Sequence, residues 1–162
     1  MLKKLQFHNV GGNFLEEDPA HFDYTFFNVI KTELLTLDPQ QRLVMENVYH
    51  ALENGTLLCR WCIMHDILTL VAGLPMEKIV GSRTGVYVTG FNHDHLAVLN
   101  ADLESALKYK VTGVSNSIIS NRLSWFFDFK GPSLTVDTAC SSSMVALHLA
   151  AQSLRSSESD IV

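Results

Sequence analysis

The segment from residue 131 to residue 151 constrains the fold of this chain more than any other stretch. Gly131-Pro132 is a turn signal, and the run at 133–137 that follows it is typical of a short strand. Cys140 comes three residues after that run. From Ser141 onward the residues are small and aliphatic, which favours a helix buried on most sides. The predicted order is therefore strand, tight turn, cysteine and helix.

A second helix is predicted from residue 39 onward. Asp38 is placed as its cap, Pro39 occupies the first helical position, and Gln41 is placed to close a capping box. Gly55 is placed where this helix would end. One buried face is indicated by apolar residues at helical spacing, namely Val44, Met45, Val48, Ala51 and Leu52.

Two more elements lie between these helices. Residues 84–90 are short, β-branched and aromatic between glycines, which predicts a buried strand. Residues 116–127 predict a helix whose apolar side carries Ile119, Leu123, Phe126 and Phe127.

Composition limits the class of protein. A chain of 162 residues that is 47% hydrophobic, without repeats or linkers, predicts one domain with a real core. The net charge of −5, with no basic run, argues against a nucleic acid partner. Lys3 and Lys4 are followed by no apolar stretch, so no secretory signal is predicted and a cytoplasmic protein is expected.

The three cysteines argue for reduced thiols, because an odd number without a signal is not a disulfide framework. Cys59, Cys62 and His65 have the spacing of zinc ligands. No fourth ligand follows at a sensible spacing, and the neighbouring residues are large and apolar. We therefore interpret these three as buried residues and predict no metal site.

The stretch at 57–74 is the most apolar part of the chain. Arg60, His65 and Asp66 interrupt it where a membrane span tolerates charge least. We predict no transmembrane helix and no membrane partner.

Cys140 is the candidate nucleophile because of its place at a strand-to-helix junction. Unpaired N–H groups and the macrodipole at a helix amino terminus favour negative charge. A thiolate would be stabilised there, and an acylated cysteine could use the same N–H groups to hold an oxyanion. From spacing alone, the alternative stays open that Cys140 is a small core residue between strand and helix.

Residues 136–143, Val-Asp-Thr-Ala-Cys-Ser-Ser-Ser, closely resemble the nucleophile motif of polyketide synthase ketosynthases (β-ketoacyl synthases), and they follow that family's Gly-Pro-Ser turn. The resemblance covers nearly the whole chain except about residues 56–71. The sequence of these motifs is most similar to that of iterative reducing synthases of the fungal type. Other blocks similar to the family occur in family order, at 12–18, 22–28, 37–42, 84–88 and 120–128.

The resemblance implies a thiolase-like α/β fold and a decarboxylative Claisen condensation. In that reaction Cys140 would take an acyl group from the phosphopantetheine of an acyl carrier protein and pass it to a malonyl-derived carbanion. The resemblance also implies that the domain holds no cofactor of its own, and that a complete domain forms a homodimer through the strand before Cys140.

Cys140 is the one catalytic residue that the resemblance assigns to this chain. The family's catalytic histidines lie in motifs downstream of the cysteine, and the seven histidines here match neither motif. His148 is the nearest in sequence, but it is about two helical turns away, so we interpret it as structural. The family's opening strand has no counterpart before Gly12. We therefore expect an amino-terminal fragment, without the first strand and the second half of the fold, that does not catalyse condensation alone.

Residues 55–71 interrupt the family-like run and are predicted to be an insertion in a β-ketoacyl synthase fragment that spans 1–162. The codons of Gly55-Thr56 permit an intron start, and those of Val71-Ala72 permit an intron end. We hypothesise a retained intron.

Two alternatives remain open. The chain could be a non-catalytic remnant or a mispredicted gene product, which flanking DNA without the downstream histidine motifs would favour. It could also be another condensing enzyme, such as one of fatty-acid elongation, although the Asp-Thr-Ala-Cys-Ser-Ser-Ser run makes this less fitting.

Overall fold

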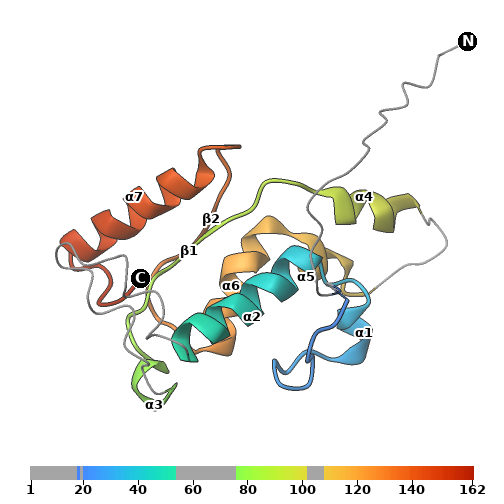
Figure 1. Cartoon of the computed structure of the whole chain (residues 1–162), viewed down its shortest axis with the longest axis horizontal. Coiled ribbons are helices and arrows are strands. Elements are labelled where there is room, and N and C mark those ends of the chain that lie inside the picture. The colour runs from blue at the N-terminus through green and yellow to red at the C-terminus, as the bar shows by residue number, and fades with distance from the viewer. Residues whose placement is uncertain (1–17, 19, 54–75, 102–107) are drawn as a thin grey trace, which may run out of the picture.

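A computed structural model describes residues 18, 20–53, 76–101 and 108–162 (Figure 1). Residues 55–71, with Cys59, Cys62 and His65, lie outside the described part. The described elements, in chain order, are α1 (Lys31–Leu34), α2 (Pro39–Glu53), α3 (Met76–Ile79), β1 (Val86–Thr89), α4 (Asp94–Ala101), α5 (Lys110–Val114), α6 (Asn116–Phe126), β2 (Ser133–Val136) and α7 (Ser142–Arg155).

The two described strands, β1 and β2, run parallel, in a register that pairs Val86 with Ser133 and Thr89 with Val136. Parallel strands need a crossover connection, which here contains α4, α5 and α6. α7 packs on one face of the strands and α6 on the other, with α2 against α6 (Figure 1). The fold is thus a layered α/β arrangement.

The core lies on the α6 side of the strands and is rich in aromatic rings. Phe27 and Phe126 have ring centroids 5.0 Å apart, and Phe127 stacks on Phe129 at 5.2 Å. Such ring pairs add about 0.5–1.5 kcal/mol to the gain from burial. The buried apolar residues of this cluster are Phe27, Val29, Leu37, Met45, Ile79, Val86, Leu123, Phe127 and Phe129.

The predicted start of α2 is confirmed, but its capping box is wrong. Asp38 Oδ1 accepts a hydrogen bond from the Gln40 N–H at 2.8 Å, as a cap should. The side chain of Gln41, however, donates from Nε2 to the Gly113 carbonyl at 2.9 Å, and the Asp38 N–H donates to the same carbonyl. Because α5 is packed against the first turn of α2, its backbone replaces the expected partner.

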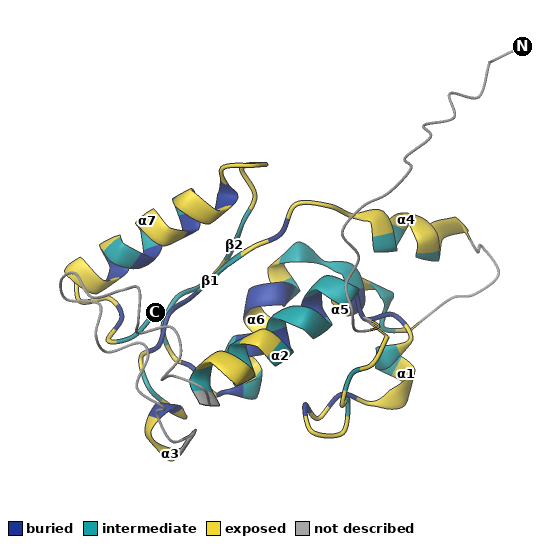
Figure 2. Ribbon diagram, viewed as in Figure 1, coloured by how far each residue is buried: buried dark blue, intermediate teal, exposed yellow. Residues whose placement is uncertain are grey.

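The predicted strand and helices around β2 are confirmed in position, but their burial is not as expected. Met144 and Leu147 of α7 are 67% and 61% exposed, so the helix is not buried on most sides (Figure 2). Of the four residues of β1, only Val86 is buried. Within the described residues, α7 and the strands each have fewer neighbours than a complete sheet would supply. The buried positions of α7 are small, namely Ser142, Ala146, Ala150 and Ser153, which lets the helix approach the strands closely.

The carboxyl end of α7 offers a stabilising substitution. The Glu158 N–H bonds to the Ser153 carbonyl and the Ser157 N–H to the Leu154 carbonyl, which is a Schellman motif with Ser157 at φ 57°. A left-handed residue that is not glycine costs about 1–2 kcal/mol, partly offset by the greater unfolded-state entropy of glycine. Ser157→Gly is therefore expected to raise the free energy of unfolding by about 0.5–1 kcal/mol.

Urea denaturation followed by circular dichroism measures this gain. Ser156→Gly is the matched control, because Ser156 has a right-handed φ of −83° and gains nothing from glycine. A Ser157→Gly variant no more stable than Ser156→Gly would contradict the prediction.

Candidate active site at the strand-to-helix junction

Cys140 lies in the short connection between the end of β2 at Val136 and the start of α7 at Ser142. Its thiol is free and the residue is exposed. The structure therefore places the predicted nucleophile at the predicted junction, and it does not bury it as a small core residue.

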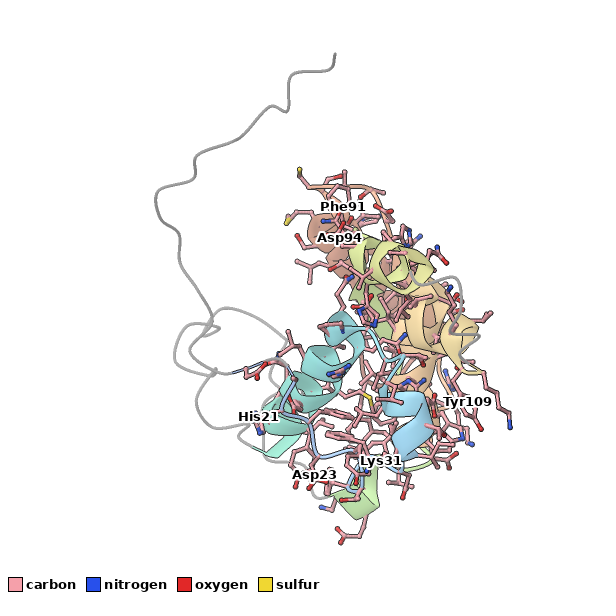
Figure 3. The ribbon with its side chains drawn as sticks, turned by 90° about the vertical axis from the view of Figure 1, so that its right-hand side faces the viewer. His21, Asp23, Lys31, Phe91, Asp94 and Tyr109 are labelled. Atoms are coloured by element: carbon pink, nitrogen blue, oxygen red, sulfur yellow. The ribbon has the colours of Figure 1, made fainter. Side chains whose placement is uncertain are left out.

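The segment after β1 leaves the strands at this same edge. The strands are parallel, and the Gly90 N–H bonds to the Val136 carbonyl at 3.3 Å. The segments that follow β1 and β2 therefore leave the strand pair at the same level. Figure 3 shows Phe91 and Asp94 of that segment near one end of the molecule, far from Asp23 and Lys31 at the other end. Ligands of open α/β sheets bind outside these carboxyl ends of the strands.

The connection that carries Cys140 is a tight turn with a strained backbone. Ala139 has φ 53°, a left-handed value that costs about 1–2 kcal/mol for a residue with a side chain. The Ala139 N–H donates to Asp137 Oδ1 at 3.1 Å. Behind it, the Ser141 N–H bonds to the Thr138 carbonyl and the Ser142 N–H to the Ala139 carbonyl. Such strain at a turn persists only where neighbouring groups hold it.

Two hydroxyl groups brace this turn from the helix side. Ser141 Oγ donates to the Thr138 carbonyl at 2.7 Å and to Thr138 Oγ1 at 3.0 Å. Ser142 Oγ accepts from the Thr138 N–H at 2.8 Å and donates to the Ala139 carbonyl at 2.7 Å. Both residues belong to the motif at 136–143, but the sequence carries no signal for these two bracing roles.

The electrostatic setting of Cys140 comes from the amino terminus of α7, a helix of 14 residues with no acidic residue in its first turn. Unpaired N–H groups at such a terminus carry partial positive charge. Among the described residues, the N–H groups of Cys140 and Ser143 have no backbone acceptor. The Cys140 N–H, which belongs to the same residue as the thiol, is therefore available to a negatively charged oxygen beside it.

The other candidates of the sequence analysis do not join this site. His148 lies on α7 with its side chain exposed. Within the described ranges, no group of three or more His, Cys, Asp or Glu residues could hold a metal ion. No helix of the described part is long and apolar enough to cross a membrane.

A buried polar network, which the sequence analysis missed, holds the scaffold beneath the site. Arg122 on α6 donates from Nη2 to Glu33 Oε1 at 2.6 Å and from Nε to Gln41 Oε1 at 2.9 Å. Arg122 and Gln41 both fall in blocks that resemble the family, and this was the only sequence feature that pointed to a role for them. Nearby on α2, burial lowers the pKa of Arg42, an effect that the charge of Asp38 opposes.

α6 is joined in turn to the strand that leads to the nucleophile. Thr135 Oγ1 in β2 donates to Ser120 Oγ at 3.0 Å and accepts from the Ser120 N–H at 3.3 Å. The position of β2, and hence of the turn at Cys140, therefore depends on where the network places α6.

An apolar cavity of about 240 Å³ lies away from this site. It is bounded by α2, α6 and β1, and Cys140 is not among its lining residues. The geometry therefore gives no reason to assign it to the chemistry of the thiol.

A comparison with protein families decides the identity of this arrangement. Residues 4–61 and 67–162 match the family described as "Beta-ketoacyl synthase, N-terminal domain". The chain belongs to the β-ketoacyl synthase family. The match includes residues 136–143 around Cys140 and every described element.

Relatives of this ketosynthase segment are large fungal synthases. It is 54% identical over 155 residues to the highly reducing polyketide synthase tazB of Aspergillus terreus, covering 96% of this chain and 5% of that protein. It is 49% identical over 148 residues to the hybrid PKS-NRPS synthetase xenE of Xenoacremonium sinensis, covering 91% of this chain and 3% of that protein. The predicted likeness to reducing fungal synthases is confirmed.

A solved ketosynthase shares the fold. The ketosynthase from module 6 of the bacillaene synthase of Bacillus subtilis superposes with a TM-score of 0.66 at 30% identity, over 88% of this chain and 20% of that chain. The predicted thiolase-like α/β fold is therefore confirmed, and the chain spans about a fifth of that ketosynthase.

Proposed function

We propose that Cys140 is the acyl-accepting nucleophile of a ketosynthase that extends polyketide chains by decarboxylative condensation. The observation that carries the proposal is the exposed thiol on a strained turn directly ahead of α7. A thiolate at a helix amino terminus is stabilised by the N–H groups and the helix dipole.

In the acylation step, Cys140 Sγ attacks the carbonyl carbon of an acyl thioester on the phosphopantetheine of an acyl carrier protein. The new C–S bond gives a tetrahedral oxyanion, which the N–H group of Cys140 would stabilise. The oxyanion collapses and breaks the bond to the phosphopantetheine sulfur. That sulfur leaves as a thiol with the proton that Cys140 lost.

In the condensation step, a malonyl thioester loses CO₂ and the resulting carbanion attacks the acyl carbonyl on Cys140. A C–C bond forms, and Cys140 leaves as the thiolate. The family resemblance assigns the catalytic histidines of this step to two motifs. The seven histidines of this chain match neither motif. In the described part β2 pairs only with β1, and its unpaired edge supports a homodimer formed through β2.

Acyl loading and thiol mapping test the proposal. The 162-residue chain is treated with a limiting acyl N-acetylcysteamine thioester, digested and analysed by peptide mass spectrometry. We expect the acyl group on Cys140 before Cys59 or Cys62, and no loading of that peptide in Cys140→Ala. First labelling of Cys59 or Cys62, or full loading in Cys140→Ala, would overturn the assignment.

A further inference from the structure

Ser142 stands apart from the two other serines of its run. It is 4% exposed, whereas Ser141 and Ser143 are exposed. Its hydroxyl points back into the turn and bonds to two peptide groups of the turn, through the Thr138 N–H and the Ala139 carbonyl. A buried hydroxyl with both a donor and an acceptor partner is held in one orientation.

The second of these bonds acts on the peptide that joins Ala139 to Cys140. The Ala139 carbonyl and the Cys140 N–H belong to one planar trans peptide, so they point in opposite directions. Ser142 Oγ donates to that carbonyl at 2.7 Å, and the Ser142 N–H donates to it at 3.1 Å. Fixing the carbonyl therefore also fixes the direction of the Cys140 N–H, which has no backbone acceptor among the described residues.

The backbone needs this restraint because Ala139 is held at φ 53°. Without the hydroxyl, the Thr138 N–H loses its 2.8 Å acceptor and the Ala139 carbonyl keeps only its weaker backbone donor. Ala139 could then relax toward a right-handed conformation, which would rotate the following peptide. The Cys140 N–H would turn away from its present direction.

We propose that Ser142 is a positioning residue: its buried hydroxyl locks the Ala139–Cys140 peptide, and so aims the Cys140 N–H at the oxyanion formed when the thiol is acylated. This inference rests on the proposed function of Cys140 and adds the residue that orients its amide. Ser142 itself touches neither the thioester nor the reacting atoms.

Two reactions of the same thiol test the inference. Acylation by an acyl N-acetylcysteamine thioester passes through an oxyanion, whereas alkylation by iodoacetamide displaces iodide from a saturated carbon and forms none. Ser142→Ala is expected to lower the acylation rate constant of Cys140 about tenfold relative to the alkylation rate constant. Ser143→Ala, the matched control, is expected to leave that ratio within about twofold, and Ser142→Thr, which keeps the hydroxyl, to restore it. A purely structural role would change both rate constants alike, so an unchanged ratio in Ser142→Ala overturns the proposal.

Hydrogen exchange decides the inference separately from the proposed function. The Thr138 amide of the unmodified chain is expected to be protected, and to exchange about tenfold faster in Ser142→Ala but not in Ser143→Ala. If the unmodified chain is alkylated on Cys140 but never acylated, the proposed function fails. The exchange result then decides whether Ser142 holds the turn. An unprotected Thr138 amide in the unmodified chain overturns the inference even if Ser142→Ala does not fold.

Discussion

Replacing Arg122 by methionine is expected to lower the free energy of unfolding by about 3 kcal/mol, because it leaves a partly buried carboxylate and a buried amide oxygen without their partner. Arg122 is 8% exposed and the side chain of Glu33 is 17% exposed, so water replaces little of what is lost. Methionine keeps most of the aliphatic volume, which isolates the polar loss from the packing loss. The change also removes the hydrogen bonds that join α6 to α1 and α2.

A double variant and a surface control make this measurement decisive. Adding Glu33→Leu to Arg122→Met removes the stranded charge and is expected to recover more than half of the loss, since a buried pair can be replaced by apolar residues at little cost. Lys130→Ala breaks the exposed ion pair with Asp128 and is expected to cost less than about 1 kcal/mol. Urea denaturation gives all three values, and an Arg122→Met loss no larger than that of Lys130→Ala would show that the network is not structural.

Replacing Gly113 by alanine is expected to lower the free energy of unfolding by about 3 kcal/mol. A Cβ at this position would lie 2.3 Å from the Thr36 carbonyl oxygen and 2.7 Å from its carbon, both of which are backbone atoms. Relief would require α5 to move away from the segment that leads into α2. That movement would stretch the bonds that the Gly113 carbonyl accepts from the Asp38 N–H and from Gln41 Nε2, both 2.9 Å.

Gly90→Ala is the matched control for this steric argument. A Cβ at Gly90 would meet Ile119 Cδ1 at 3.0 Å and Thr135 Cγ2 at 3.3 Å, which are the ends of side chains rather than backbone. These ends can shift by a few tenths of an ångström, so we expect a loss of about 1 kcal/mol or less. Thermal unfolding of both variants measures the difference, and equal losses would contradict the backbone clash at Gly113.

Much of the local structure could be predicted because it depends on short stretches of sequence. Asp38 and Pro39 mark the start of α2 by capping and by a fixed φ, and both roles are local. The glycine, proline and β-branched residues at 131–136 likewise place β2. The burial of α7 was misjudged because hydrophobicity alone does not say which neighbours a helix has, and the small residues turned out to be the buried ones.

The sequence by itself determined the order of strand, turn, cysteine and helix around Cys140, and the motif that resembles the ketosynthase nucleophile. The tertiary structure alone decided the partners of Gln41 and Arg122. Gln41 bonds to Gly113, which is 72 residues away, and Arg122 bonds to Glu33, which is 89 residues away. Local periodicity and backbone preference carry no information about such distant pairs, because these contacts exist only after the helices have packed together. The burial of the Ser142 side chain has a similar cause. Of the three consecutive serines at 141–143, only Ser142 is buried, and this requires that α7 already lies against the strands.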